Sequence, residues 1–82
     1  MEPSPLSPSN LLRNVLRECA ESYRLTYREE QIVDLILQGW SNKAIAAGCN
    51  ITEQTVKDHL KHVYRKMGVH QRTAVIAKVL QS

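Results

Sequence analysis

The most constraining feature of the sequence is the stretch ITEQTVKDHLKHVYRKMGV, residues 51–69, in which apolar residues recur at helical spacing. Four of them, separated by four, three and four residues, would share one side of a helix: Val56, Leu60, Val63 and Met67. Thr52 can cap the start of this helix, and Gly68 can end it in the left-handed conformation. The pattern predicts a helix over residues 53–67 that packs against a core.

The opposite side of that helix would carry side chains that end in hydrogen-bonding groups: Gln54, Lys57, Asp58, Lys61 and Arg65. Alone, such a stripe is compatible with an ordinary solvated face, since most helices of a small domain have one. The charge of the chain is uneven, however. Residues 1–40 carry four Arg and six acidic residues, whereas residues 41–82 carry seven basic and two acidic residues. A polyanionic partner would therefore contact the second half of the chain first.

The rest of the chain repeats apolar residues at helical spacing, and no segment alternates convincingly with a period of two, which predicts an all-α fold with five helices. Residues 9–24 would form an N-terminal helix with one apolar stripe: Leu12, Val15 or Leu16, Cys19 and Tyr23. Before this helix, three prolines within residues 1–8 predict a disordered lead.

Signals for helix ends place the remaining helices. Thr26 and Glu29 match a capping box, so a helix should start there and end near Gly39. Ser41 can cap a short helix through NKAIAAGCN, whose small residues let another helix approach closely. A second turn at residues 48–51 leads to the helix over 53–67, and the final HQRTAVIAKVLQS predicts a last short helix.

The length of 82 residues suits one small domain. No stretch approaches the roughly 18 unbroken apolar residues that a membrane span needs, and the start lacks the basic and apolar regions of a secretory signal. We therefore expect a cytoplasmic protein without a membrane partner. Cys19 and Cys49 are 30 residues apart without a CxxC spacing, so we expect buried small apolar groups rather than a disulfide.

A short helix of small residues, a tight turn and a capped basic helix make up the layout of a helix-turn-helix. The second helix of that motif enters the major groove of DNA, which is about 12 Å wide and admits one α-helix. A slim first helix lets the second one protrude. The layout therefore predicts that residues 53–67 bind double-stranded DNA.

Residues 25–80 resemble the LuxR-type (GerE-like) DNA-binding domain. The resemblance covers more than two-thirds of the chain and rests on residues in register with the family pattern: Leu25-Thr26, Arg28-Glu29, Gly39, Ser41-Asn42-Lys43, Ile45-Ala46, Ile51, Thr55-Val56-Lys57, His59, Lys66, Val69 and Arg72-Thr73. It implies a tetrahelical helix-turn-helix bundle over residues 25–82, to which this chain adds an N-terminal helix. The four implied helices lie near 27–38, 42–48, 53–67 and 71–81.

The resemblance also implies roles for individual residues. Lys57 and Lys61 match positions that contact base edges, and Asp58 stands at a base-facing position that is more often apolar in the family. Contacts with the DNA backbone are expected from a further set of side chains: Asn42, Lys43, Gln54, Thr55, His62 and Arg65.

One domain of this size offers too little contact area for tight site-specific binding, so a homodimer on a repeated or palindromic site is expected. The last helix commonly forms the dimer contact in the family, which makes Val75 and Val79 candidate interface residues, with core packing as the competing explanation. The N-terminal helix would either pack on the domain or support dimerisation. RNA polymerase is a further candidate partner, and no small-molecule ligand or cofactor is expected for this domain.

Two residues have two interpretations each. Asp58 could accept a hydrogen bond from a cytosine N4 amine, or it could pair with basic neighbours on its helix, notably His62. Trp40 stands where the family usually has a smaller residue, and it could form a lid over the turn or an exposed anchor for a partner protein. We favour the lid because an indole usually buries most of its area. Asp58 and Trp40 together motivate the alternative function, a protein-binding adaptor or anti-activator that dimerises with another regulator.

Catalytic and metal sites are not expected. The sequence has no Gly-rich phosphate loop, nucleophile elbow or paired-carboxylate arrangement, so it does not indicate an enzyme. His59, His62 and Cys49 lie within 14 residues but do not have a standard four-ligand spacing. The chain is compatible with a free-standing regulator or with the output domain of a response regulator. Its operator, its input signal and the direction of regulation stay open.

Overall fold

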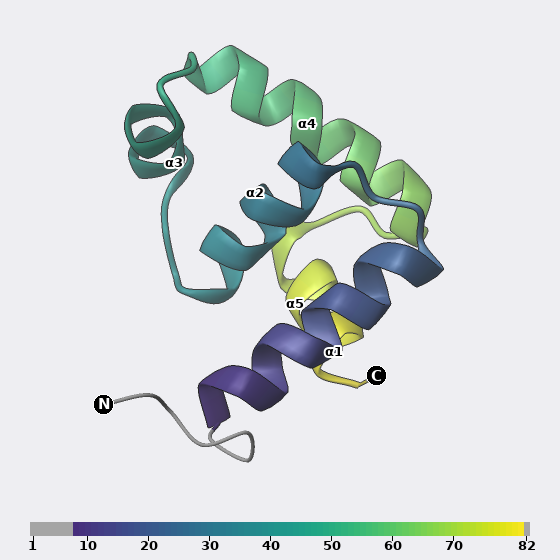
Figure 1. Cartoon of the computed structure of the whole chain (residues 1–82). Helices are drawn as coiled ribbons and strands as arrows, with labels where there is room; N and C mark the ends of the chain where they lie inside the picture. Colours follow the sequence, from purple (N-terminus) through teal and green to yellow (C-terminus); the bar gives the residue numbers. More distant parts are fainter. Residues whose placement is uncertain (1–7, 82) are drawn as a thin grey trace, which may run out of the picture.

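The computed structural model describes residues 8–81, which form five α-helices and no strand (Figure 1). The helices are α1 (Pro8–Ser22), α2 (Tyr27–Leu37), α3 (Asn42–Cys49), α4 (Glu53–Met67) and α5 (Arg72–Leu80). The all-α prediction is confirmed, and α4 has the predicted bounds. The N-terminal helix begins at Pro8, one residue earlier than expected, because proline fits the first helical position, where no N–H is needed. The rest of the predicted disordered lead lies outside the described residues.

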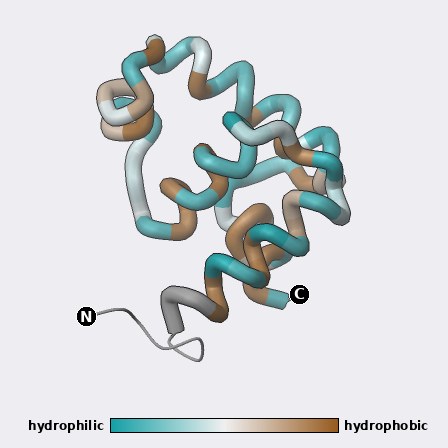
Figure 2. The backbone as a smooth tube through the Cα atoms, in the orientation of Figure 1, coloured by the Kyte–Doolittle hydropathy of each residue, from teal (hydrophilic) through white to brown (hydrophobic). Residues whose placement is uncertain are grey.

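In Figure 1, α4 forms the long upper edge of the molecule, α3 joins its N-terminal end through a turn, and α2 lies between them and the lower helices. Helices α1 and α5 pack against each other and against α2. Hydrophobic and hydrophilic residues alternate along α4, whereas α5 is hydrophobic over most of its length (Figure 2). The two helices therefore differ in their exposure to solvent. One side of α4 faces the solvent, whereas more of the surface of α5 is covered by other helices.

The core consists of two clusters of buried side chains, and α4 contributes to both. One cluster joins the N-terminal half of α4 to α2 and α3: Ile32, Ile36, Ile45, Ala46, Val56 and Leu60. The other joins the C-terminal half of α4 to α1, α2 and α5: Leu16, Cys19, Val33, Val63, Met67, Val69, Val75 and Val79. Tyr64 packs against both clusters. All four residues of the predicted stripe on α4 are buried, as the spacing predicted.

Helix α1 packs on the domain, which was one of its two expected roles. Leu16 and Cys19 lie in the second cluster. Arg17 Nη1 donates to Glu30 Oε1 of α2 over 2.6 Å, and Lys78 Nζ of α5 lies 5.4 Å from the centre of the Tyr23 ring. The additional helix is thus joined to the four-helix bundle by apolar burial and an ion pair, and the residue that follows it, Tyr23, adds a cation–π contact.

The helix ends follow the expected signals. Thr26 and Glu29 form the capping box of α2, and Ser41 and Thr52 accept hydrogen bonds from the backbone of α3 and α4. Gly68 ends α4 with a φ of 69°, in the left-handed conformation that glycine adopts without steric cost. The residue that ends α3 in this conformation is Asn50, with a φ of 57°.

Glu29 is a buried acidic residue that joins the start of α2 to the C-terminal half of α4. Its Oε1 accepts from the Thr26 backbone N–H over 2.9 Å and from Lys66 Nζ over 2.6 Å. Lys66 Nζ also donates to the Arg24 carbonyl oxygen over 3.1 Å. Burial of the carboxyl group raises its pKa, but the hydrogen bonds from Lys66 and Thr26, with the charges of Lys66 and His62, lower the pKa below its usual value overall.

We predict that Glu29→Gln lowers the free energy of unfolding by about 1–3 kcal/mol near neutral pH, because Gln can still cap α2 but does not carry the charge that binds Lys66. The folded-state pKa of Glu29 is lowered, so this contribution is present above the usual value of about 4.5 and is lost as the pH falls through the folded-state pKa. Urea unfolding of both proteins over this pH range checks the prediction. A stability difference that does not shrink on acidification would contradict it.

Candidate nucleic-acid interface

Helices α3 and α4 form a tightly joined pair. Asn50 turns the chain at the end of α3, the Ile51 N–H donates to the Ala46 carbonyl over 3.0 Å, and Thr52 Oγ1 accepts from the Thr55 N–H over 3.0 Å. Ile45 and Ala46 share the first core cluster with the N-terminal half of α4. Because the residues of α3 are small, the helix packs closely and leaves the outer side of α4 uncovered.

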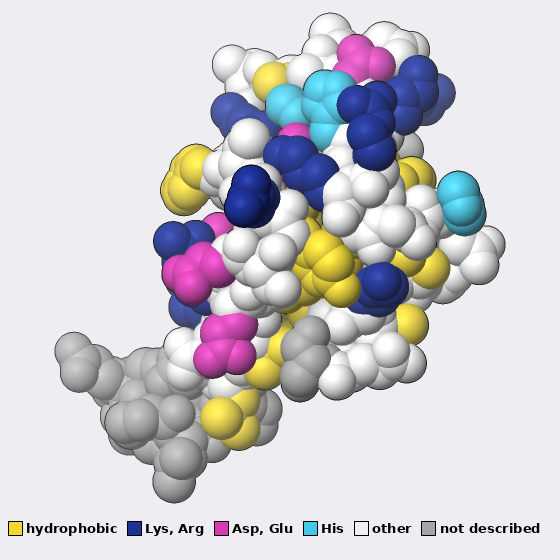
Figure 3. All heavy atoms as spheres, turned by 90° about the vertical axis from the view of Figure 1, so that its right-hand side faces the viewer, with side chains coloured by type: hydrophobic (Ala, Val, Ile, Leu, Met, Phe, Trp, Pro, Cys, Tyr) yellow, Lys and Arg dark blue, Asp and Glu magenta, His cyan; other side chains and the backbone are white. Residues whose placement is uncertain are grey.

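The uncovered side of α4 is strongly polar. Its exposed residues after the first position are Gln54, Lys57, Asp58, Lys61, His62, Arg65 and Lys66. Figure 3 views the molecule from the α4 side and shows Lys, Arg and His side chains gathered over its upper part. Within residues 8–81, no carboxylate forms an ion pair with Lys57, Lys61 or Arg65. These three cations are therefore available to an anionic partner.

The single acidic residue among these cations is paired within its own helix. Gln54 Nε2 donates to Asp58 Oδ1 over 3.1 Å, one helical turn apart. Asp58 therefore has a partner on its own helix, but that partner is the neutral amide of Gln54 and not a basic neighbour such as His62, which one interpretation had predicted. The carboxylate has a second oxygen, so the pairing does not prevent Asp58 from accepting another hydrogen bond.

His62 contacts a buried carboxylate on one side and the solvent on the other. Its Nδ1 lies 3.8 Å from Glu29 Oε2, and its side chain is 53% exposed. The carboxylate that His62 approaches is therefore Glu29 of α2 and not Asp58 of its own helix. The contact of His62 with a phosphate stays a prediction.

Two of the other predicted backbone contacts lie at the start of α3. Ser41 Oγ caps the helix by accepting from the Ala44 N–H over 3.1 Å, and Lys43 is exposed. Asn42 is half-buried, and its Oδ1 accepts a hydrogen bond from Arg72 Nη1 over 2.7 Å. Thr55, on α4, is half-buried with its hydroxyl 2.9 Å from that of Thr52.

Arg72 is a residue to which sequence reasoning assigned no role. It is the first residue of α5, and besides Asn42 it contacts the carbonyl oxygen of Trp40, to which Nη2 donates. The only indication in the sequence that Arg72 has a role was its match to the family pattern. The residues that it contacts are 30 and 32 positions away, so no local spacing could have indicated them.

Trp40 lies over the start of the helix-turn-helix. A Cβ atom on Gly48 would be 2.8 Å from the Trp40 ring, so the indole packs directly on the backbone of α3. The residue is nevertheless 38% exposed and belongs to the exposed large hydrophobic residues of the described chain. The contact with Gly48 agrees with the lid interpretation of Trp40, and the exposed area agrees with the anchor interpretation. The contact also gives Gly48 a role, because a side chain there would collide with the ring.

Core packing, the competing explanation for Val75 and Val79, is what the structure shows. Both side chains are fully buried in the second core cluster, because the 3.6-residue period of α5 turns them toward α1, α2 and α4. The outer side of α5 instead presents Thr73, Ala77 and Leu80, spaced by four and three residues. Leu80 is among the exposed large hydrophobic residues of the described chain.

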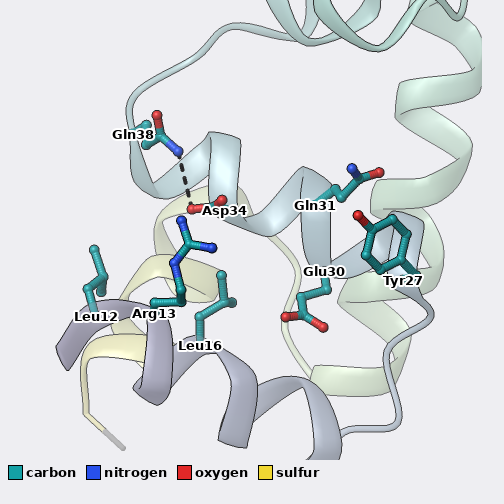
Figure 4. A pocket seen from close by; sticks show the side chains of 8 residues that line it. All are labelled: Leu12, Arg13, Leu16, Tyr27, Glu30, Gln31, Asp34 and Gln38. Atoms are coloured by element: carbon teal, nitrogen blue, oxygen red, sulfur yellow. Dashed lines mark hydrogen bonds between the residues drawn. The ribbon is translucent and has the colours of Figure 1, made fainter. Parts of the chain in front are cut away.

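A groove of about 370 Å³ is lined by residues of α1 and α2 on another part of the surface (Figure 4). Its two carboxylates are already engaged: Glu30 binds Arg17, and Asp34 Oδ1 accepts from Gln38 Nε2 over 3.2 Å. In the described part of the chain, no three His, Cys, Asp or Glu residues are grouped so that they could hold a metal ion. No described helix is long and apolar enough to cross a membrane.

A slim helix, a tight turn and a second helix with an apolar inner side and a cationic outer side define a helix-turn-helix DNA-binding domain. Residues 23–79 match the family described as bacterial regulatory proteins, luxR family. The chain therefore belongs to the luxR family, as its sequence pattern indicated, and it is a DNA-binding transcription regulator domain.

Curated relatives agree with this assignment. The chain is 39% identical over 71 residues to the response regulator protein VraR of Staphylococcus saprophyticus, and equally to that of Staphylococcus aureus and Staphylococcus epidermidis. Each match covers 85% of this chain and 34% of the relative, so the chain spans about a third of the length of these relatives. No solved structure gives a significant match.

We predict that Asp58→Asn strengthens binding to duplexes that offer Asp58 no cytosine N4 amine roughly fivefold, because one repulsive charge near the phosphates, worth about 1 kcal/mol in water, is removed. Fluorescence anisotropy with several unrelated duplexes measures the effect. Glu21→Gln on α1 is the matched control, since it removes an exposed carboxylate far from α4 in the sequence. Weaker binding confined to duplexes with particular cytosines would show that Asp58 accepts from a base, whereas unchanged binding to all the duplexes would contradict the prediction.

Proposed function

We propose that this chain binds double-stranded DNA sequence-specifically, with α4 in the major groove, as the DNA-binding part of a cytoplasmic transcription regulator. The observation that carries the proposal is the row of unpaired cations on α4: Lys57, Lys61 and Arg65. Burial of the opposite side holds α4 in one orientation, so these cations face outward together.

The proposed base contacts lie near the middle of α4. Lys57 and Lys61 are one turn apart and exposed, and their ammonium groups can donate to guanine O6 and N7. Asp58 lies beside Lys57 and can accept from a cytosine N4 amine through the oxygen that Gln54 does not bind. This set would provide sequence preference.

The proposed backbone contacts lie on both sides of that set. The phosphates of one DNA strand would be contacted by residues at the start of α3, Asn42 and Lys43, and at the start of α4, Gln54 and Thr55. His62 and Arg65 toward the end of α4 would contact the other strand. Charged contacts of this kind release counterions, so they supply affinity that depends on salt and not on sequence.

We also propose that the domain binds as a homodimer through the outer side of α5, now defined by Thr73, Ala77 and Leu80. The domain is small, and single modules bury too little area for tight specific binding. An exposed leucine and an alanine on one side of a short helix offer an apolar strip for a second copy.

To test the DNA interface, Lys57→Ala is compared with Lys43→Ala on a preferred duplex selected from a random pool and on unrelated duplexes. Lys57→Ala is expected to cost about 1–3 kcal/mol on the preferred duplex and to relax base preference. Lys43→Ala is expected to weaken all duplexes alike and to reduce the slope of log K against log salt by about one unit.

The salt dependence also separates DNA binding from the adaptor hypothesis. A wild-type protein that fails to bind any duplex at low salt would refute the proposed function and favour a protein-binding adaptor. Equal, sequence-independent losses from the two lysine variants would show that Lys57 contacts only phosphate.

To test the dimer, Leu80→Gln is expected to weaken binding to a duplex with two half-sites about tenfold or more, because a buried leucine contributes about 1.5–3 kcal/mol. Binding to a single half-site should be unchanged. Leu11→Gln is the matched control, since Leu11 is an exposed leucine of α1. Equal weakening of both duplexes would contradict a dimer contact at Leu80.

A further inference from the structure

We infer that Arg72 is a positioning residue for DNA binding, which holds the side chain of Asn42 so that it can only donate hydrogen bonds to the duplex. This inference rests on the proposed function. It assigns to α5 a part in phosphate recognition at the start of α3, in addition to its part in the core.

The contact between the two helices is specific. The guanidinium of Arg72 donates from Nη1 to Asn42 Oδ1 over 2.7 Å and from Nη2 to the carbonyl oxygen of Trp40. Its two nitrogens thus bind the first residue of α3 and the turn that precedes it. A lysine could not make both contacts in the same way, because its ammonium is a single point and lacks the planar fork of arginine.

The chemistry of arginine fixes the orientation of the asparagine amide. A guanidinium has only donors, so the Asn42 atom that faces it must be the carbonyl oxygen. The remaining polar group of the side chain is the NH2, which has two donors and no acceptor. Phosphate oxygens only accept, and Asn42 is partly exposed, so the fixed amide suits a phosphate contact.

The start of α3 needs such a tether. Helix α3 packs mainly on α4, through Ile45 and Ala46 near its middle. The segment before it contains Gly39, with a φ of 87°. The contact of Arg72 with the Trp40 carbonyl and the packing of the Trp40 ring on Gly48 hold this segment from both sides. Arg72 therefore determines where Asn42 lies relative to α4.

The first test compares Asn42→Asp with Asn42→Ala. The aspartate keeps an acceptor for Arg72, strengthens that contact by its charge and suits the first turn of a helix, so the melting temperature should stay equal or rise. DNA affinity should nevertheless fall about three- to tenfold in the alanine variant, as expected for one lost hydrogen bond, and a further roughly fivefold in the aspartate variant. A protein that is more stable but binds less well separates this role from a purely structural one.

The second test is a double-mutant cycle. Arg72→Ala should weaken binding to all duplexes in the wild-type protein, and it should have a much smaller effect when Asn42 is already alanine. Arg72→Lys should recover only part of the affinity. Arg13→Ala on α1 controls for the loss of one positive charge, because Arg13 is exposed and belongs to a helix outside the helix-turn-helix.

The outcomes distinguish this inference from the proposed function. If the wild-type protein does not bind duplex DNA at low salt, both are overturned. If it binds and Asn42→Asp binds equally well, or if Arg72→Ala has the same effect in both backgrounds, only the role of Arg72 is overturned. Loss of affinity without loss of melting temperature in Asn42→Asp, together with a non-additive cycle, supports it.

Discussion

The burial of one side of α4 against two core clusters is the constraint on which the rest of the structure depends. The N-terminal half of α4 packs on α2 and α3, and its C-terminal half packs on α1, α2 and α5. A helix buried in this way cannot rotate about its axis without exposing apolar area. The same burial therefore determines which side chains of α4 face the solvent, and these include the unpaired cations of the proposed interface.

Polar contacts between residues that are distant in the sequence fix the relative positions of the helices more closely than apolar packing does. Apolar packing is not directional, so it tolerates small shifts of one helix along another, whereas hydrogen bonds do not. Glu29 and Lys66 join α2 to the C-terminal half of α4, and Arg72 joins α5 to the start of α3. Each contact links one end of the helix-turn-helix to a helix that lies outside it. The orientation of the cationic side thus also depends on residues of α2 and α5, which lie outside the helix-turn-helix.

The features that were predicted correctly are local. The bounds of α4, the capping box at Thr26 and Glu29, and the inner stripe of α4 depend on residues a few positions apart. The features that local spacing left open concerned the direction or the partner of a side chain. Val75 and Val79 are buried because three other helices surround their side of α5. Asp58 binds Gln54, whereas His62 approaches Glu29 of another helix.

Periodicity and helix caps were sufficient to predict an all-α chain with a capped cationic helix, because they act over one or two helical turns. The uneven charge and the family pattern follow from the order of residues along the chain and require no knowledge of the packing. The tertiary structure alone decided that α1 belongs to the core, that Trp40 covers Gly48, and that Arg72 binds Asn42. The physical reason is the distance along the chain between the residues that make contact. A side chain 30 positions away becomes a neighbour only when several helices have packed, and no spacing within a single helix records that arrangement.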